Sequence, residues 1–106
     1  MQTVIITFAL RGLDRAGFAR LAEDSAGPIA RVSGLIGKVY LVDEPSNTYG
    51  GVYFFVDRAS AEAYLTSEIV DALRSHPNVA EITVGLYDTI EAATRITQRQ
   101  LPLLAA

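Results

Sequence analysis

The sequence has no cysteine and no tryptophan, only one histidine (His76), and only one lysine (Lys38). Without cysteine, the chain forms no disulfide, no thiolate metal site and no cysteine nucleophile. One histidine cannot supply a multi-histidine metal centre within a single chain. We therefore expect a protein without a metal site.

Basic residues are also few. The chain carries 9 basic and 12 acidic residues, a net charge of −3. The arginines are scattered, whereas a nucleic acid partner favours clustered Lys and Arg.

No apolar run approaches the roughly 20 residues of a membrane span. The opening MQTVIITFAL lacks the basic region and cleavage site of a signal peptide. We expect a cytoplasmic protein with neither a nucleic acid nor a membrane as partner.

The pattern of the remaining residues predicts alternating strands and helices. Strands are predicted by β-branched and apolar runs at 3–10, 35–43, 50–56 and 79–88. Asp14 and Asp57 are typical helix N-caps. They predict one helix that ends near Ser33, with a kink or break at Pro28, and a second, continuous helix that ends before Pro77. A short helix is predicted at 89–98, and the tail to residue 106 is unassigned.

This order of elements predicts a single α+β domain over residues 1–106. The order β-α-β-β-α-β is that of the ferredoxin-like fold. Right-handed crossovers place the first and third strands in the centre of an antiparallel four-stranded sheet.

Side-chain alternation sorts the strands into two faces. One set is wholly apolar and is expected to face the helices: Val4, Ile6, Phe8, Leu10, Val39, Leu41, Val52, Phe54, Val56, Ile82, Val84 and Leu86. The other is expected to face away from them: Thr3, Ile5, Thr7, Lys38, Tyr40, Val42, Tyr53, Phe55, Glu81, Thr83 and Tyr87. The second set is still too apolar for a soluble monomer, so we expect two copies to pack through this sheet face as a homodimer.

Several spaced motifs in the hairpin and the following helix are similar to one family. They are Gly34-Leu35, Lys38-Val39-Tyr40, Gly50-Gly51-Val52-Tyr53, Phe55 with Asp57, Ser60-Ala61, Ala63-Tyr64-Leu65 and Tyr87-Asp88. In these residues, over about the C-terminal two-thirds, the chain resembles the YdhR-like monooxygenases of the dimeric α/β-barrel superfamily. The resemblance implies a ferredoxin-like subunit, a barrel-forming dimer and an oxygenase that acts on small aromatic compounds.

No motif for a cofactor accompanies this resemblance. Gly50-Gly51 lacks the spacing and the following helix of a dinucleotide site, and a bulge or a close approach of strands explains the pair better. An oxygenase needs no cofactor if its substrate supplies the electrons, as a deprotonated phenol or quinol does. Such an enzyme needs an apolar cavity, a base, and hydrogen-bond donors for the developing oxyanion.

Five residues are candidates for these roles. Lys38 and His76 are the candidate catalytic groups, Lys38 as the cation that holds a phenolate and His76 as a base whose pKa lies near neutrality. Tyr40, Tyr53 and Tyr64 are the candidate pocket residues. Each has a structural alternative: Lys38 as an ion-pair partner of Glu81 across the dimer, the tyrosines as interface or core packing, and His76 as a solvated loop residue.

The function expected from the sequence is therefore a cofactor-independent monooxygenase for a small aromatic or quinol-type compound. The alternative is a non-catalytic module of the same fold that binds a small apolar ligand. An isomerase or lactone-processing enzyme is a weaker third option. Haem degradation is less favoured in a chain without tryptophan.

Overall fold

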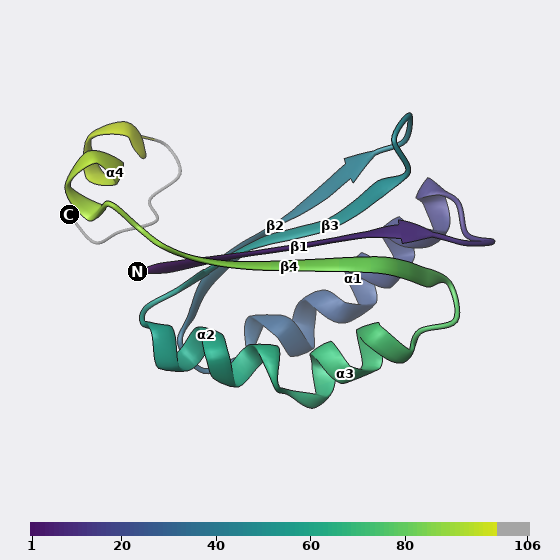
Figure 1. Ribbon diagram of the computed structural model, residues 1–106, viewed down its shortest axis with the longest axis horizontal. Coiled ribbons are helices and arrows are strands. Elements are labelled where there is room, and N and C mark those ends of the chain that lie inside the picture. The colour runs from purple at the N-terminus through teal and green to yellow at the C-terminus, as the bar shows by residue number, and fades with distance from the viewer. Residues whose placement is uncertain (100–106) are drawn as a thin grey trace.

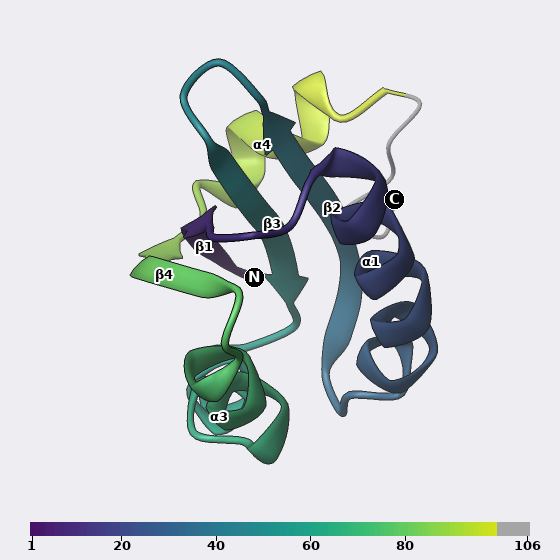
Figure 2. The ribbon, with the colours of Figure 1, turned by 90° about the vertical axis from the view of Figure 1, so that its right-hand side faces the viewer.

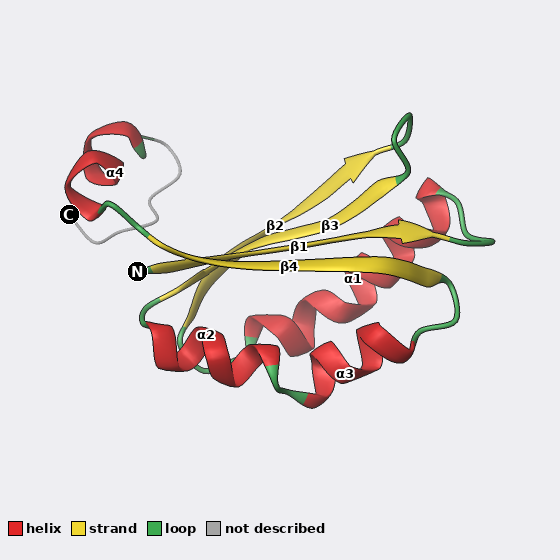
Figure 3. Ribbon diagram, viewed as in Figure 1, coloured by secondary structure: helices red, strands yellow, loops and turns green. Residues whose placement is uncertain are grey.

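The computed structural model describes residues 1–99 and contains a four-stranded sheet covered by helices on one side (Figures 1 and 3). The elements follow in the order β1 (Gln2–Leu10), α1 (Arg15–Ala30), β2 (Leu35–Asp43), β3 (Thr48–Phe55), α2 (Arg58–Leu65), α3 (Glu68–Ser75), β4 (Val79–Asp88) and α4 (Glu91–Thr97). The strands pair antiparallel in the order β2-β3-β1-β4. The predicted ferredoxin-like α+β fold, with β1 and β3 central, is confirmed.

The two predicted helix starts are confirmed by their caps. The carboxylate of Asp14 accepts a hydrogen bond from the backbone N–H of Gly17, and that of Asp57 accepts one from Ser60, each at 2.8 Å. Each bond satisfies an N–H that the first helical turn leaves without a partner. The backbone hydrogen bond lowers the pKa of the Asp57 carboxyl, so the cap stays charged well below neutral pH.

The predicted break at Pro28 is wrong, because α1 runs through this residue to Ala30. Pro28 lies in the last turn, where its missing N–H costs the helix a single hydrogen bond. The helix ends directly afterwards, and Arg31 donates its backbone N–H to the Pro28 carbonyl at 3.2 Å.

The single helix predicted after Asp57 is two helices, α2 and α3, separated at Thr66 and Ser67. The Ser67 hydroxyl donates to the Tyr64 carbonyl at 2.6 Å, and the Thr66 hydroxyl lies 3.3 Å from the Glu62 carbonyl. Short hydroxyl side chains compete in this way for the carbonyls that a continuing helix would use. The break lets α3 turn onto the end of the sheet near β4.

The face assignment from the sequence is right for β1 and β4 and wrong for β2 and β3. Directly paired residues share a face, and Val4 pairs with Tyr53, which in turn pairs with Lys38. Lys38, Tyr40, Tyr53 and Phe55 therefore lie on the face that the helices cover, here called the helix face. Tyr53 and Phe55 are 3% and 0% exposed, whereas Val39 and Val56, predicted inside, are 42% and 54% exposed.

The opposite side, here called the outer face, carries no covering helix from α1, α2 or α3 (Figure 1). By the same pairing, its large side chains are Ile5, Val39, Leu41, Val52, Phe54 and Tyr87. In β2 and β3, both alternating sets of side chains are apolar, so hydrophobicity alone does not show which set faces the helices. A shift of one residue in register moves every side chain of a strand to the other face.

Gly50 holds β3 against β1 in this register. Its φ is +154°, and a Cβ there would lie 1.9 Å from the carbonyl oxygen of Ile6. The close strand approach expected for the glycine pair is confirmed at this position. Below the sheet, Val4, Ile6, Phe55 and Val70 are the largest fully buried side chains of the core.

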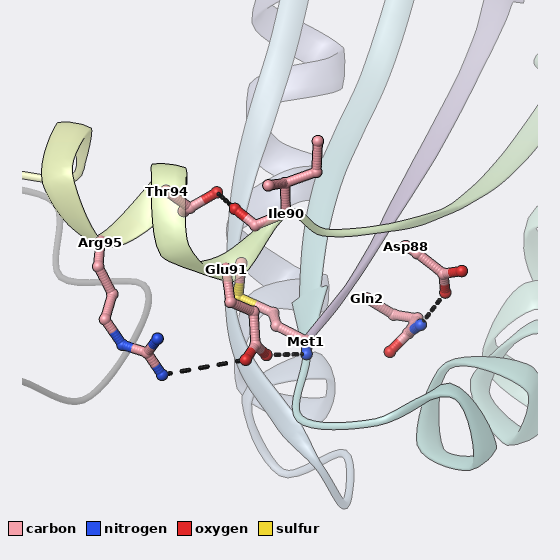
Figure 4. A network of polar contacts seen from close by, with 7 residues as sticks. All are labelled: Met1, Gln2, Asp88, Ile90, Glu91, Thr94 and Arg95. Atoms are coloured by element: carbon pink, nitrogen blue, oxygen red, sulfur yellow. Dashed lines mark hydrogen bonds and ion pairs between the residues drawn. The ribbon is translucent and has the colours of Figure 1, made fainter.

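Helix α4 lies beyond the sheet, next to the start of β1 (Figures 1 and 4). The Met1 ammonium is paired with the Glu91 carboxylate, which also lies 3.9 Å from Arg95. The Gln2 amide contacts Asp88 at the end of β4. The exposed side chains of Ile90 and Ile96 show that α4 adds little to the core.

We expect Gly50→Ala to destabilise the protein by more than about 2 kcal/mol, since it combines a strained φ with a clash against backbone. Gly27→Ala is the matched control. Gly27 lies in α1 with no atom closer than 3.6 Å to an added Cβ. Alanine there removes a flexible residue from a helix and should stabilise the folded protein by about 0.5–1 kcal/mol. Urea unfolding of the two variants and the wild type measures both effects. A Gly50→Ala variant as stable as the wild type would contradict the proposed role of Gly50.

Candidate functional site

A cavity of about 320 Å³, here called the central cavity, lies between the helix face and helices α1 and α3. Figure 2 views the sheet with α1 and α3 on either side of this region. Its wall is mostly apolar and comes from every labelled element except α4: Phe8, Phe18, Leu21, Ala22, Ser25, Pro28, Ile29, Lys38, Tyr40, Gly50, Tyr53, Tyr64, Ile69, Ala72, Leu73, His76 and Val79.

All five candidate residues named from the sequence line the central cavity. Lys38 and Tyr40 come from β2, Tyr53 from β3, Tyr64 from α2, and His76 from the end of α3. The hairpin register directs the first three side chains toward the helices. The residues are thus brought together on the helix face, although Lys38, Tyr40 and Tyr53 were expected on the outer face.

The Lys38 amine faces aromatic rings. Its Nζ lies 3.7 Å from the ring centroid of Tyr40 and 4.5 Å from that of Tyr53. Within residues 1–99, no carboxylate lies within ion-pairing distance of it. Glu81, the alternative partner considered from the sequence, is exposed and contacts Arg11 at 3.5 Å.

Burial lowers the pKa of Lys38 from 10.5 to about 7. The physical cause is loss of hydration, which the charged form needs more than the neutral form. The two ring faces stabilise the ammonium by about 0.5–2 kcal/mol, less than the hydration of a free ammonium. Near neutral pH the neutral and charged forms of Lys38 therefore coexist, so this side chain can accept a proton as well as hold an anion.

The Tyr40 hydroxyl belongs to a short hydrogen-bonded chain. It lies 3.0 Å from the Ser25 hydroxyl, which itself donates to the Ala22 carbonyl at 3.0 Å. Since a serine hydroxyl has one hydrogen to donate, Tyr40 is the donor to Ser25. The phenol oxygen of Tyr40 keeps its lone pairs free to accept from a ligand.

Tyr53 and Tyr64 form the aromatic floor of the cavity, with ring centroids 5.0 Å apart. Both are 3% exposed. Burial raises the pKa of each phenol, and for Tyr53 the neighbouring Tyr64 raises it further. Both tyrosines therefore remain protonated at neutral pH and act as hydroxyl donors, not as bases.

His76 is held in one tautomer. Its Nδ1 accepts a hydrogen bond from the backbone N–H of Asn78 at 3.1 Å. A neutral imidazole that accepts at Nδ1 carries its proton on Nε2. In this arrangement His76 presents an N–H donor at Nε2, whereas the sequence predicted it as a base.

Sequence reasoning missed two residues of the site. Ser25 was unremarkable within the first helix, and only the fold brings it to Tyr40. Gly51 makes room for the lysine: a Cβ there would lie 2.5 Å from Cε of Lys38. Gly51 belongs to one of the family motifs and lies inside a strand, where a glycine often marks a close approach by another group.

Together these features define a ferredoxin-like domain with an apolar, aromatic cavity, one partly buried amine, and several hydroxyl and N–H donors. A family model described as "Putative mono-oxygenase ydhR" matches residues 4–100, and the chain belongs to this family. The match confirms the resemblance seen in the sequence and extends it to β1 and α1. No curated protein matches the chain.

Several solved structures share the fold. The protein NE2512 from Nitrosomonas europaea has a TM-score of 0.71 and 17% identity, over 84% of this chain and 88% of its own. SnoaB, a cofactor-independent oxygenase from Streptomyces nogalater, has a TM-score of 0.65 and 20% identity over 84% and 92%. The heme-degrader MhuD from Mycobacterium tuberculosis has a TM-score of 0.67 and 12% identity over 85% and 96%. At these identities, the similarity supports the fold alone.

Two further observations apply to residues 1–99. No helix in this part is long and apolar enough to cross a membrane. No group of three histidine or carboxylate side chains lies in a metal-binding arrangement.

We expect Lys38 to titrate near pH 7. Because it is the only lysine, reductive methylation with ¹³C-formaldehyde gives a single side-chain signal, whose chemical shift follows the titration by NMR. The folded-state pKa lies below the unfolded value, so folding stability should rise as pH increases from about 7 toward 10.5. Lys38→Met should remove this rise. A titration near 10.5 would mean that the amine is hydrated.

Proposed function

We propose that the protein is a cofactor-independent monooxygenase that binds a small, flat phenol or quinol in the central cavity. The observation that carries this proposal is the partly buried Lys38 amine, which lies among aromatic rings and, within residues 1–99, has no carboxylate partner. Membership of a family described as mono-oxygenases supports the reaction class. SnoaB, which shares the fold, gives a precedent for oxygenation without a cofactor.

Lys38 is the proposed base. Its neutral amine takes the phenolic proton of the substrate, and the resulting ammonium stays beside the phenolate that it has made. The ammonium and the phenolate attract each other in a site of low polarity, where such attraction is stronger than in water. Donors from Tyr64 and His76 are available to the oxyanion that develops later, while the Tyr53 hydroxyl donates to Tyr64.

The bound phenolate is electron-rich enough to reduce dioxygen. One electron passes to O₂, and the radical pair combines to form a carbon–oxygen bond at an activated ring carbon. The resulting peroxide loses water to leave a carbonyl. Phenol and O₂ thus give quinone and water, one oxygen atom entering the product and the other leaving in water. The substrate supplies all four electrons.

The protein is proposed to act as a cytoplasmic homodimer joined through the outer face. Six large side chains lie there, of which Val39 and Tyr87 are exposed and the others partly exposed: Ile5, Val39, Leu41, Val52, Phe54 and Tyr87. Burial of a large apolar side chain contributes about 1.5–3 kcal/mol, so this set is sufficient to drive association. The sequence predicted a different set of outward-facing side chains. The set found here is also apolar, so a dimer through the sheet is still proposed.

For the reaction, we expect oxygen uptake with simple quinols or polycyclic phenols in the absence of added metal or flavin. Lys38→Met should reduce kcat/KM by about 100-fold or more, the usual contribution of a general base. For the wild type, kcat/KM should rise with pH through about 7, as Lys38 loses its proton.

Arg20→Met is the matched control, since Arg20 is exposed on α1 and does not line the cavity. It should keep wild-type uptake. A broad panel of phenols without uptake would reject the oxygenase. Retention of an unchanged ligand would then favour the binding module, and conversion of a substrate under strict anaerobiosis would favour the isomerase.

For the assembly, we expect a dimer in sedimentation velocity experiments, and Val52→Glu on the outer face should shift it to monomer. Ala63→Glu, at an exposed position of α2, introduces the same charge elsewhere and should leave the dimer intact. Circular dichroism checks that both variants fold. A wild-type chain that sediments as a monomer at micromolar concentration would contradict the proposed interface.

A further inference from the structure

We propose that Lys38 is also a nucleophile, and that the central cavity is a carbonyl-binding site in which a flat aromatic aldehyde condenses with Nζ to form an imine. This inference goes beyond oxygenation and does not depend on it. It concerns a covalent step at the amine, whereas the oxygenase uses the same amine only to move a proton.

The first support is the position of the amine. Nζ lies at the cavity wall over the rings of Tyr40 and Tyr53, and within residues 1–99 it has neither an ion-pair partner nor a hydrogen-bond acceptor. Its lone pair is therefore not committed elsewhere when the amine is neutral. Desolvation in an apolar pocket, which lowers the pKa of Lys38 to about 7, is one of the ways in which lysine becomes a nucleophile.

The second support is the shape and chemistry of the wall. The cavity of about 320 Å³ has room for a one- or two-ring compound, and Phe8, Phe18, Tyr53 and Tyr64 give it flat aromatic surfaces. Gly51 keeps the lysine stem against the sheet, since a side chain there would displace Cε. The space above the amine thus remains open to a planar ligand.

The condensation is balanced without a further reactant. The neutral amine adds to the carbonyl carbon to form a C–N bond, and a proton passes from nitrogen to oxygen. The hydroxyl group then leaves as water while the C=N bond forms, with no change in oxidation state. The proton that this hydroxyl takes up as it leaves comes from solvent water and is returned when the nitrogen loses its own, while His76 offers a hydrogen bond from Nε2–H in the same cavity because its Nδ1 is occupied by Asn78.

The test is reductive trapping with 4-hydroxybenzaldehyde and cyanoborohydride at pH 7, followed by peptide mapping in the mass spectrometer. The chain carries the additional substitution Arg20→Lys, so that an exposed lysine in the same molecule serves as the internal reference. At pH 7 about half of the Lys38 amine is neutral, against less than about 0.1% of an ordinary lysine, so Lys38 should be labelled about 100-fold faster even if its lower basicity weakens it.

Unfolding in urea should remove this advantage and make the two lysines react equally, although it increases access to Lys38. Labelling of Lys38 no faster than that of the introduced lysine in the folded protein would overturn the proposal, as would modification confined to the N-terminal amine. Oxygen uptake with phenols is measured separately on the unlabelled protein, so either proposal can fail while the other stands.

Discussion

The contact of β3 with β1 determines which side chains the helices cover, and the site depends on that contact. Gly50 allows the two backbones to approach, and the register places Tyr53 opposite both Val4 and Lys38. A hydrophilic amine is thereby forced beneath two helices, among aromatic rings. The lowered pKa of Lys38 follows from this placement, as does its lack of a carboxylate partner among residues 1–99.

Local signals in the sequence were sufficient for most of the fold. The bounds of β2 and β4 and the caps at Asp14 and Asp57 follow from residue preferences that act within a few positions. The division between α2 and α3 was missed because the apolar spacing continues across Thr66 and Ser67, although their hydroxyls bind the backbone. The faces of β2 and β3 required the pairing with β1, which is not a local property of either strand.

The candidate site could also be predicted only in part from the sequence. Lys38 is the only lysine, and Tyr40, Tyr53 and Tyr64 lie in the family motifs, but nothing in the sequence places them together with His76. The structure also assigns protons that the sequence leaves open, because a backbone N–H occupies Nδ1 of His76 and Ser25 accepts from Tyr40. For this reason the base proposed above is Lys38, whereas the sequence predicted His76 in that role.

The crowding of tyrosines around the cavity also has an optical consequence. The chain has five tyrosines and no tryptophan, so its ultraviolet emission comes from tyrosine alone. Three of the five, at positions 40, 53 and 64, line the cavity. An aromatic guest there lies close to most of the emitting rings, and its entry should change the intrinsic fluorescence without any attached dye.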